Sequence, residues 1–144
     1  CFRCGGIYGP GRGPLFSARK STATKSAAPT EETVKYVNRI LVDDICGALL
    51  AAVSSDRPTS GGRVYNLVDD DPAPRSEVTK EAHRLLGTES SKSTKTDNAA
   101  PRRGTPRNTG NKRCRNQRLK DDYGWKLNAP TFREGLSILL ELVN

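Results

Sequence analysis

Residues 34–53 read VKYVNRILVDDICGALLAAV, and two patterns meet in this stretch. Residues 34–42 are rich in β-branched and aromatic side chains and end in a continuous apolar run, which favours a largely buried strand. Asp43 or Asp44 can cap a following helix by accepting the free N–H groups of its first turn. Apolar residues then recur at helical spacing: Ile45, Leu49 and Ala52 or Val53. A strand that runs directly into a helix is a βα unit, so the stretch predicts an α/β fold.

A second unit of the same kind follows this one along the chain. Residues 63–68, within GGRVYNLVDD, predict a strand that is entered by a turn at residues 61–62. After the turn DDDPAP, a helix capped near Ser76 is expected. Its apolar face is formed by Val78, Ala82, Leu85 and Leu86. Gly87 is expected to end the helix, because glycine tolerates the positive φ of the residue that follows a helix.

Two more helices are predicted toward the C-terminus. The sequence RNQRLKDDYGWKL predicts a short helix that stops at Gly124. In the next segment Thr131 and Glu134 form a capping box behind Pro130, and a longer helix begins there. Its apolar face is formed by Phe132, Leu136, Leu139, Leu140 and Val143. Gly135 costs this helix about 1 kcal/mol relative to alanine, so we interpret it as a sign of close packing.

The remaining segments are polar, and only 34% of the 144 residues are hydrophobic. Residues 13–33 show little periodicity and predict a loop with at most one helical turn. Residues 88–111 contain no Leu, Ile, Val, Phe, Tyr or Trp. They cannot bury enough apolar surface to offset their ordering entropy, so we expect disorder there. No run is long and apolar enough to span a bilayer.

The net charge of +8 comes from one segment, because residues 101–120 carry eight Lys or Arg and no acidic residue. Such a segment could bind nucleic acid by neutralising phosphates. It lacks interleaved aromatic residues that would stack on bases, so a solvated loop is the favoured interpretation. A small basic nucleic-acid-binding module that uses residues 101–120 is kept as the alternative function.

Candidate metal and nucleophile sites are weak. The four cysteines are scattered: Cys1, Cys4, Cys46 and Cys114. The first two form a CxxC pair, but a zinc site needs two further ligands, and the only histidine is His83. The acidic runs 43–44 and 69–71 are typical of helix caps and turns. We therefore predict no metal site and no catalytic residue in this chain, and the cysteine usage favours a reducing, intracellular compartment.

The N-terminal stretch CFRCGGIYGPGRG is rich in glycine but does not match a phosphate-binding motif. It has no GK[ST] ending, and it runs into a polar loop instead of opening a helix. The chain begins on Cys1 and contains no methionine. We therefore expect a piece of a longer or processed protein, from which a targeting segment could have been lost.

Four segments in succession resemble the extended short-chain dehydrogenases/reductases, the NAD-dependent epimerase/dehydratase family. FRCGGIYGPGR resembles the strand and Tyr-Gly-Pro-Gly turn that follow the family's Tyr-x-x-x-Lys. NRILVDDI resembles Arg-Ile-His-Val-x-Asp, with Leu41 where histidine is usual. GGRVYNLVDDDP resembles the next strand and turn, and NKRCRNQRLKDDYGWKLNAPTFREGL resembles the C-terminal helices of the family.

The resemblance implies an α/β fold, namely an incomplete Rossmann-like domain with its last strands and helices, a substrate-binding lobe and a disordered insert. Residues 1–12 would end the nucleotide-binding core, and residues 13–87 would form the substrate-binding lobe with its βα units. Residues 88–111 would be the disordered loop and residues 112–144 the C-terminal helices. The implied cofactor is NAD or NADP, and the implied substrate carries a hydroxyl group, with a sugar nucleotide as one candidate.

The resemblance also implies binding residues. Those at the nicotinamide end of the cofactor are Gly5, Gly6, Ile7 and Tyr8. The side chains of Tyr8 and Arg12 would face the cleft, and Arg39 would contact an anionic or sugar-nucleotide substrate. The glycine-rich fingerprint and the Tyr-x-x-x-Lys of the family lie outside the matching segments, so we expect the chain alone to be inactive and poorly stable. A nicotinamide dinucleotide and a small substrate are the expected partners of the complete protein, with homodimerisation and a non-catalytic scaffold left open.

Overall fold

The structure is a computed structural model, and it describes residues 1–21, 36–56, 62–88 and 111–143. The elements in chain order are β1 (Phe2–Cys4), β2 (Gly6–Tyr8), α1 (Pro14–Ser21), β3 (Tyr36–Val37), β4 (Arg39–Leu41), α2 (Val42–Val53), β5 (Tyr65–Leu67), β6 (Ala73–Pro74), α3 (Arg75–Leu85), α4 (Gln117–Tyr123) and α5 (Phe132–Val143). The predicted α/β class is confirmed. The predicted disordered insert at 88–111 falls almost entirely outside the described residues.

Three strand pairs organise the fold. Strands β1 and β5 are parallel, with Phe2 opposite Tyr65. Strands β2 and β4 are also parallel, with Gly6 opposite Arg39. The short strands β3 and β6 pair antiparallel. The first two pairs are joined at Gly5 and Gly6, where the chain leaves β5 as its partner and takes up β4.

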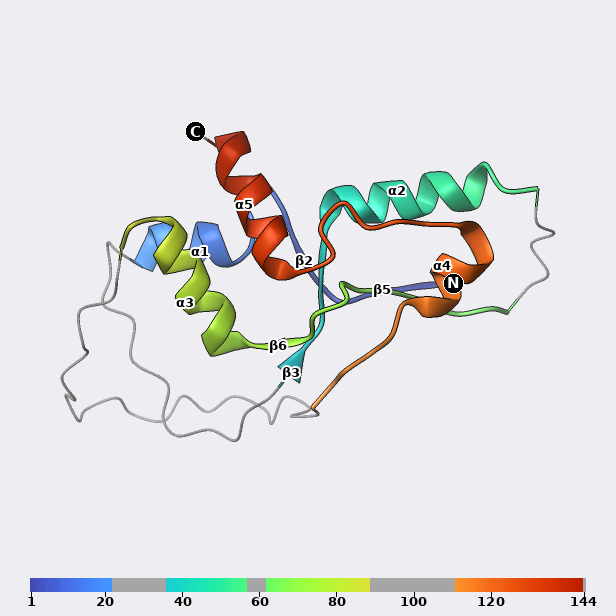
Figure 1. Ribbon diagram of the computed structural model, residues 1–144, viewed down its shortest axis with the longest axis horizontal. Coiled ribbons are helices and arrows are strands. Elements are labelled where there is room, and N and C mark those ends of the chain that lie inside the picture. The colour runs from blue at the N-terminus through green and yellow to red at the C-terminus, as the bar shows by residue number, and fades with distance from the viewer. Residues whose placement is uncertain (22–35, 57–61, 89–110, 144) are drawn as a thin grey trace.

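The helices form two groups on either side of these strands, with α1, α3 and α5 in one group and α2 and α4 in the other (Figure 1). Each group covers its own core. The first core contains Tyr8, Ala18, Leu41, Ala73, Val78, Ala82, Ala129, Phe132, Leu136 and Leu139. The second contains Ile40, Ala48, Tyr65, Leu67, Leu119 and Trp125. Ile40 and Leu41 enter different cores because successive side chains of a strand point to opposite faces.

The βα unit at residues 34–53 is present, but its cap prediction was wrong. Its strand part is divided into β3 and β4, with residues 34–35 outside the described part of the chain. The residue that caps α2 is Leu41, and no side chain bonds to the first turn. Asp44 instead lies inside the helix and is buried, because it accepts hydrogen bonds from the segment before α5.

The predicted apolar face of α2 was wrong in part. Ile45 packs against the second core as predicted, but Leu49 and Val53 are 45% and 84% exposed, whereas Ala48 is fully buried. The physical reason is the close approach of Trp125, whose indole nitrogen would lie 3.7 Å from a Cβ at Gly47. The helix therefore buries its side of small residues and leaves larger apolar side chains outside.

Two elements were missed. Helix α1 occupies part of the predicted loop 13–33, and β6 occupies part of the predicted turn before α3. Helix α3 is capped by Pro74 and not by Ser76, and no side-chain cap bond is present. Pro74 has the extended conformation (φ −60°, ψ 145°) from which a helix can start.

The predicted helix ends are confirmed. Gly87 and Gly124 follow α3 and α4 with φ of 64° and 62°, in the region that glycine reaches without steric cost. The capping box is formed, since the Thr131 N–H donates to Glu134 Oε2 at 2.9 Å and the Glu134 N–H donates to Thr131 Oγ1 at 3.4 Å.

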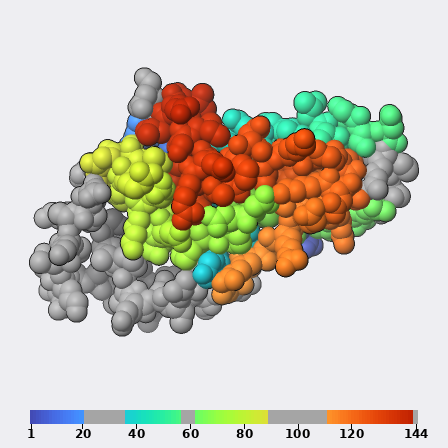
Figure 2. All heavy atoms as spheres, in the orientation of Figure 1, coloured from blue at the N-terminus to red at the C-terminus, as the bar shows by residue number. Residues whose placement is uncertain are grey.

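The C-terminal segments wrap over earlier parts of the chain. In Figure 2 the orange and red atoms of the C-terminal region cover much of the visible face. Among the described helices, none combines the length and the apolar character that a bilayer crossing requires.

Candidate functional site

The glycine pair, Gly5 and Gly6, lies where the chain changes strand partner. The Gly5 N–H donates to the Leu67 carbonyl of β5 at 2.9 Å, and the Gly6 N–H donates to the Asn38 carbonyl beside β4 at 2.8 Å. The carboxyl ends of parallel strands are the usual ligand-binding edge of an α/β sheet. Gly5 directly follows the carboxyl end of the β1–β5 pair, whereas Gly6 begins β2 at the amino end of the β2–β4 pair. The cofactor role of the glycine pair therefore stays a prediction.

The two glycines differ in what surrounds them. A Cβ on Gly5 would lie 2.9 Å from the Asn38 carbonyl oxygen, so strand packing itself requires glycine there. A Cβ on Gly6 would lie 3.5 Å from the same oxygen, which is an ordinary contact. Gly6 is exposed and Ile7 is 38% exposed. The open surface at the glycine pair is thus formed by Gly6 and Ile7, and the missing side chain of Gly6 lets a flat group approach the backbone there.

Tyr8 departs from the expectation that its side chain faces a cleft. It is 1% exposed and belongs to the first core, beneath α5. Burial raises the pKa of the Tyr8 hydroxyl above its ordinary value, and the nearby carboxylate of Asp69 raises it further. Within the described part of the chain this hydroxyl has no hydrogen-bond partner. The backbone of Tyr8, and not its side chain, therefore remains for the predicted cofactor contact.

Arg39 and Arg12 are not brought together. The Arg39 side chain is 7% exposed, and its Nη1 donates to the carbonyls of Val37 and Ala73, each at 3.1 Å. Burial lowers the pKa of Arg39, and Asp69 partly offsets this effect. Arg12 is exposed in a turn closed by two hydrogen bonds with Gly9. The substrate-binding role of both arginines stays a prediction.

Asp69 was interpreted as a turn residue, but it joins β4 to the end of β5. Its N–H donates to the Arg39 carbonyl at 2.6 Å, and its Oδ1 accepts the Arg39 N–H at 3.4 Å. Burial raises the pKa of Asp69 to about 7, although the N–H and the charge of Arg39 act in the opposite direction. The sequence feature that could have indicated this role of Asp69 is an acidic residue directly after a predicted strand.

We expect Asp69 to make folding stability depend on pH. Its pKa is about 7 in the folded chain and near 3.8 when unperturbed, so the unfolded chain releases the proton first. Stability is then fully retained below about pH 4 and falls as the pH rises to about 7, by on the order of 2–4 kcal/mol. Urea titrations between pH 4 and 8 should show this decline, and Asp69→Asn should show a smaller one, to which the raised pKa of buried Asp44 still contributes.

The exposed residue Asp56 supplies the matched control for this measurement. An Asp56→Asn variant should retain the wild-type decline. Equal pH profiles for the wild type and Asp69→Asn would show that Asp69 is not the titrating group.

A second missed feature is the basic segment, residues 111–116, which three asparagine side chains hold against the strands. Asn38 accepts the Cys114 N–H at 2.7 Å and donates to the Cys114 carbonyl at 3.4 Å. Asn66 donates to the Arg115 carbonyl at 3.1 Å. Asn116 donates to the Val68 carbonyl and to Asp70, each at 2.8 Å. The segment therefore runs along the same strand ends that carry the glycine pair.

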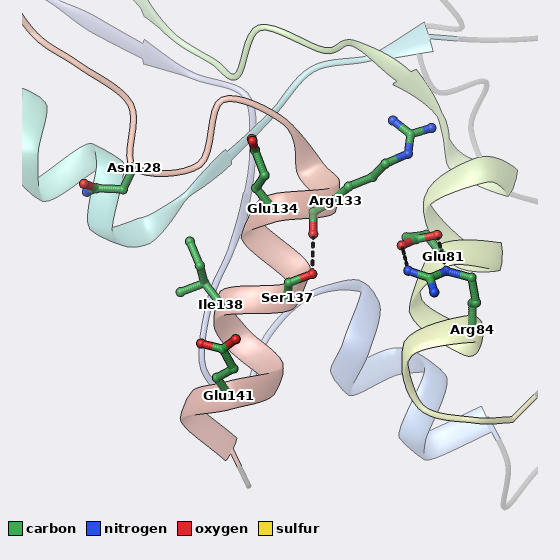
Figure 3. Close-up of a pocket in the computed structure, with 8 residues that line it drawn as sticks. All are labelled: Glu81, Arg84, Asn128, Arg133, Glu134, Ser137, Ile138 and Glu141. Atoms are coloured by element: carbon green, nitrogen blue, oxygen red, sulfur yellow. Dashed lines mark hydrogen bonds and ion pairs between the residues drawn. The ribbon is translucent and has the colours of Figure 1, made fainter.

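An open polar groove lies elsewhere, between α3 and α5 (Figure 3). Its two arginines are paired with carboxylates, because Arg84 binds Glu81 and Arg133 binds Asp71 and Glu77. None of the predicted site residues lines this groove. It is therefore separate from the edge at the glycine pair.

The cysteines do not come together as a metal site. All four are free and exposed, and the residues that the structure describes contain no group of three or more histidine, cysteine or acidic side chains suited to a metal ion.

Comparison with known proteins identifies relatives along nearly the whole chain. No protein-family profile matches the sequence. A 3-diazoavenalumate denitrifying reductase from Streptomyces sp is 31% identical over 141 residues, which are 93% of this chain and 44% of that protein. A conserved protein of unknown function from Silicibacter pomeroyi is 35% identical with a TM-score of 0.72, over 97% of this chain and 48% of that one.

A Methylobacillus flagellatus protein assigned to the NAD-dependent epimerases/dehydratases is 27% identical with a TM-score of 0.67, over 99% of this chain and 46% of that one. The chain is similar in sequence and fold to the NAD-dependent epimerases/dehydratases. It also shares its fold with a UDP-glucuronic acid 4-epimerase from Bacillus cereus, solved with UDP-glucuronic acid and NAD. That enzyme is 13% identical, with a TM-score of 0.66 over 99% of this chain and 44% of the enzyme.

The similarity to these solved structures confirms the Rossmann-like fold expected from the four motifs. The chain spans less than half the length of each of these proteins.

Proposed function

We propose that this chain is the substrate-side half of an NAD(P)-dependent epimerase, dehydratase or reductase that acts on a hydroxyl-bearing small molecule. When bound, the dinucleotide would supply or accept a hydride. Gly6, Ile7 and the backbone of Tyr8 would lie along its nicotinamide end. The observation that carries the proposal is the glycine pair, which joins two parallel strand pairs directly after the carboxyl end of β1–β5 and leaves Gly6 and Ile7 exposed.

The surface of the chain supports the idea that a nucleotide-binding half completes it. In the described residues β1 pairs only with β5, although parallel strands are normally buried within larger sheets. Helix α2 exposes one apolar stripe at helical spacing, formed by Cys46, Leu49, Leu50 and Val53. An unpaired strand edge and an apolar stripe of this kind mark a surface that another polypeptide covers.

The substrate class is suggested by the relatives. One acts on 3-diazoavenalumate, and another was solved with UDP-glucuronic acid and NAD. A sugar nucleotide is accordingly one candidate substrate. The division into a cofactor-side strand at 1–12, a substrate-binding lobe at 13–87 and C-terminal helices at 112–144 belongs to the same proposal.

The test replaces the matching region of the Methylobacillus flagellatus protein with this chain. The chimera is expected to bind NADH, measured by nicotinamide fluorescence, whereas the isolated chain is not. The isolated chain should also melt at a lower temperature than the chimera, measured by circular dichroism. Turnover by the isolated chain, or an isolated chain as stable as the chimera, would contradict the proposal.

Substitution of Gly6 distinguishes an effect on cofactor binding from an effect on stability. Gly6→Ala should leave the free energy of unfolding within about 1 kcal/mol of wild type, because its Cβ meets only an ordinary contact. The same change should weaken NADH binding by the chimera roughly tenfold, since the methyl group would occupy the open edge. Gly5→Ala is the matched control, and it should destabilise the fold by about 1–3 kcal/mol.

A further inference from the structure

We propose that three arginines around the glycine pair, Arg3, Arg113 and Arg115, bind the carboxylate or phosphate group of an anionic substrate. The inference rests on the proposed function, because it takes the glycine pair as the floor of the site. It assigns a set of binding residues that the sequence motifs did not indicate.

Asn38 connects the glycine pair to two of these arginines. Its carbonyl accepts the Gly6 N–H at 2.8 Å, while its side-chain amide holds both the N–H and the carbonyl of Cys114. Arg113 and Arg115 flank Cys114 in the chain. One buried asparagine therefore fixes the position of both arginine backbones relative to the open edge at Gly6.

Asn66 links Arg3 to the segment that carries Arg115. Arg3 and Asn66 are register partners in the parallel pair β1–β5, so their side chains are neighbours on one face of that pair. The Asn66 side chain donates to the Arg115 carbonyl at 3.1 Å. The segment that carries Arg115 thus crosses the strand pair beside Arg3.

The Arg113 side chain is held in position before any ligand arrives. Its guanidinium carbon lies 3.7 Å from the centre of the Tyr36 ring, a stacking arrangement that is favourable for arginine. The Tyr36 backbone is itself bonded to Asn111 and Lys112. An arginine ordered in this way loses less conformational freedom when it binds an anion.

The three arginines also lack compensating charge. All three are exposed, and no acidic side chain pairs with any of them in the described part of the chain. By contrast, Arg63, Arg84 and Arg133 each form an ion pair. Guanidinium groups without acidic partners, of which that of Arg113 is held against Tyr36, suit bidentate binding of carboxylate or phosphate. They are also better placed for this role than Arg39, whose Nη1 already donates to two buried carbonyls.

The test titrates the 144-residue chain with UDP and, separately, with benzoate, while the ¹⁵N resonances of the arginine side chains are recorded by NMR. Uridine serves as the neutral probe. We expect one of the two anions to shift the Arg113 and Arg115 resonances at millimolar concentration, and uridine to shift neither. A response to UDP would identify phosphate as the bound group, and a response to benzoate would identify carboxylate.

Matched variants distinguish a site from general positive charge. Arg115→Gln should weaken binding of the responding anion about tenfold, because a charge-assisted bond is lost. Arg118→Gln removes the same charge from the neighbouring helix and should have less than a roughly threefold effect. Equal losses in both variants, or no binding of either anion below about 10 mM, would overturn the proposal. Since NADH is absent from this measurement, its outcome is independent of the chimera experiment.

Discussion

Gly135→Ala is expected to destabilise the protein by about 2–3 kcal/mol, although alanine favours helices over glycine by about 1 kcal/mol. Packing reverses the direction of the effect on stability that helix propensity alone would give. Gly135 is buried in α5 directly against Tyr8, and a Cβ there would collide with the hydroxyl and the ring of that tyrosine. Tyr8 itself is surrounded by the first core and cannot withdraw. Urea denaturation of both proteins measures the difference.

The same contact predicts a coupling between the two positions. Tyr8→Phe removes a buried hydroxyl that has no partner among the described residues, so its own effect should be small. When Gly135→Ala is combined with Tyr8→Phe, it should be less destabilising by at least about 1 kcal/mol, because the most crowded atom is gone. Strict additivity of the two substitutions would contradict the contact.

Asp44→Ala is expected to cost about 2–4 kcal/mol of stability, the other large effect. Asp44 is completely buried, and its carboxylate accepts the N–H of Asn128 at 2.6 Å and the N–H of Ala129 at 3.2 Å. Removal of the carboxylate would leave both N–H groups unpaired. Because these bonds join the start of α2 to the segment before α5, urea denaturation should report the loss for the whole chain.

The adjacent residue provides the control for this prediction. Asp43 is exposed in the same helical turn, so Asp43→Ala should change stability by less than about 0.5 kcal/mol. Asp44→Asn should lie between wild type and Asp44→Ala, since its amide oxygen can still accept one N–H. Similar losses for Asp43→Ala and Asp44→Ala would show that the helix start, and not the buried carboxylate, determines the effect.

Local sequence patterns predicted the features that depend on a few adjacent residues. The stops at Gly87 and Gly124 and the capping box of α5 require only the backbone preferences of the residues involved. Close packing at Gly135 was also predicted, because a glycine in the middle of a helix needs a reason. The partner in that contact, Tyr8, lies far away in the sequence and was not identified.

The features that were missed depend on distant segments. Asp44 resembles a helix cap in sequence, but its partners are 84 and 85 residues away. The exposed face of α2 was set by Trp125, which approaches the side with small residues. Likewise, Asn38 and Cys114 are 76 residues apart, and nothing local in either segment predicts their bonds. Helical periodicity alone cannot identify such contacts.

The family motifs indicated candidate binding residues, and the structure adds how exposed each one is. Gly6 and Ile7 are exposed. Tyr8 and Arg39, which the resemblance placed at the cofactor and the substrate, are buried, and their binding roles stay predictions. Burial of this kind depends on the core around each side chain, so the motif alone could not predict it.

The pairing pattern of the strands has a consequence for synthesis of the chain. The amino group of Cys1 donates to the Arg63 carbonyl, 62 residues later. The hydrogen bond from the Cys114 N–H to the Asn38 side chain spans 76 residues. A chain that emerges from the ribosome in order cannot complete either parallel pair until the later strand has been made. High contact order of this kind slows folding toward the millisecond-to-second range, so β1 and β2 spend part of that time as unprotected extended segments, open to chaperones.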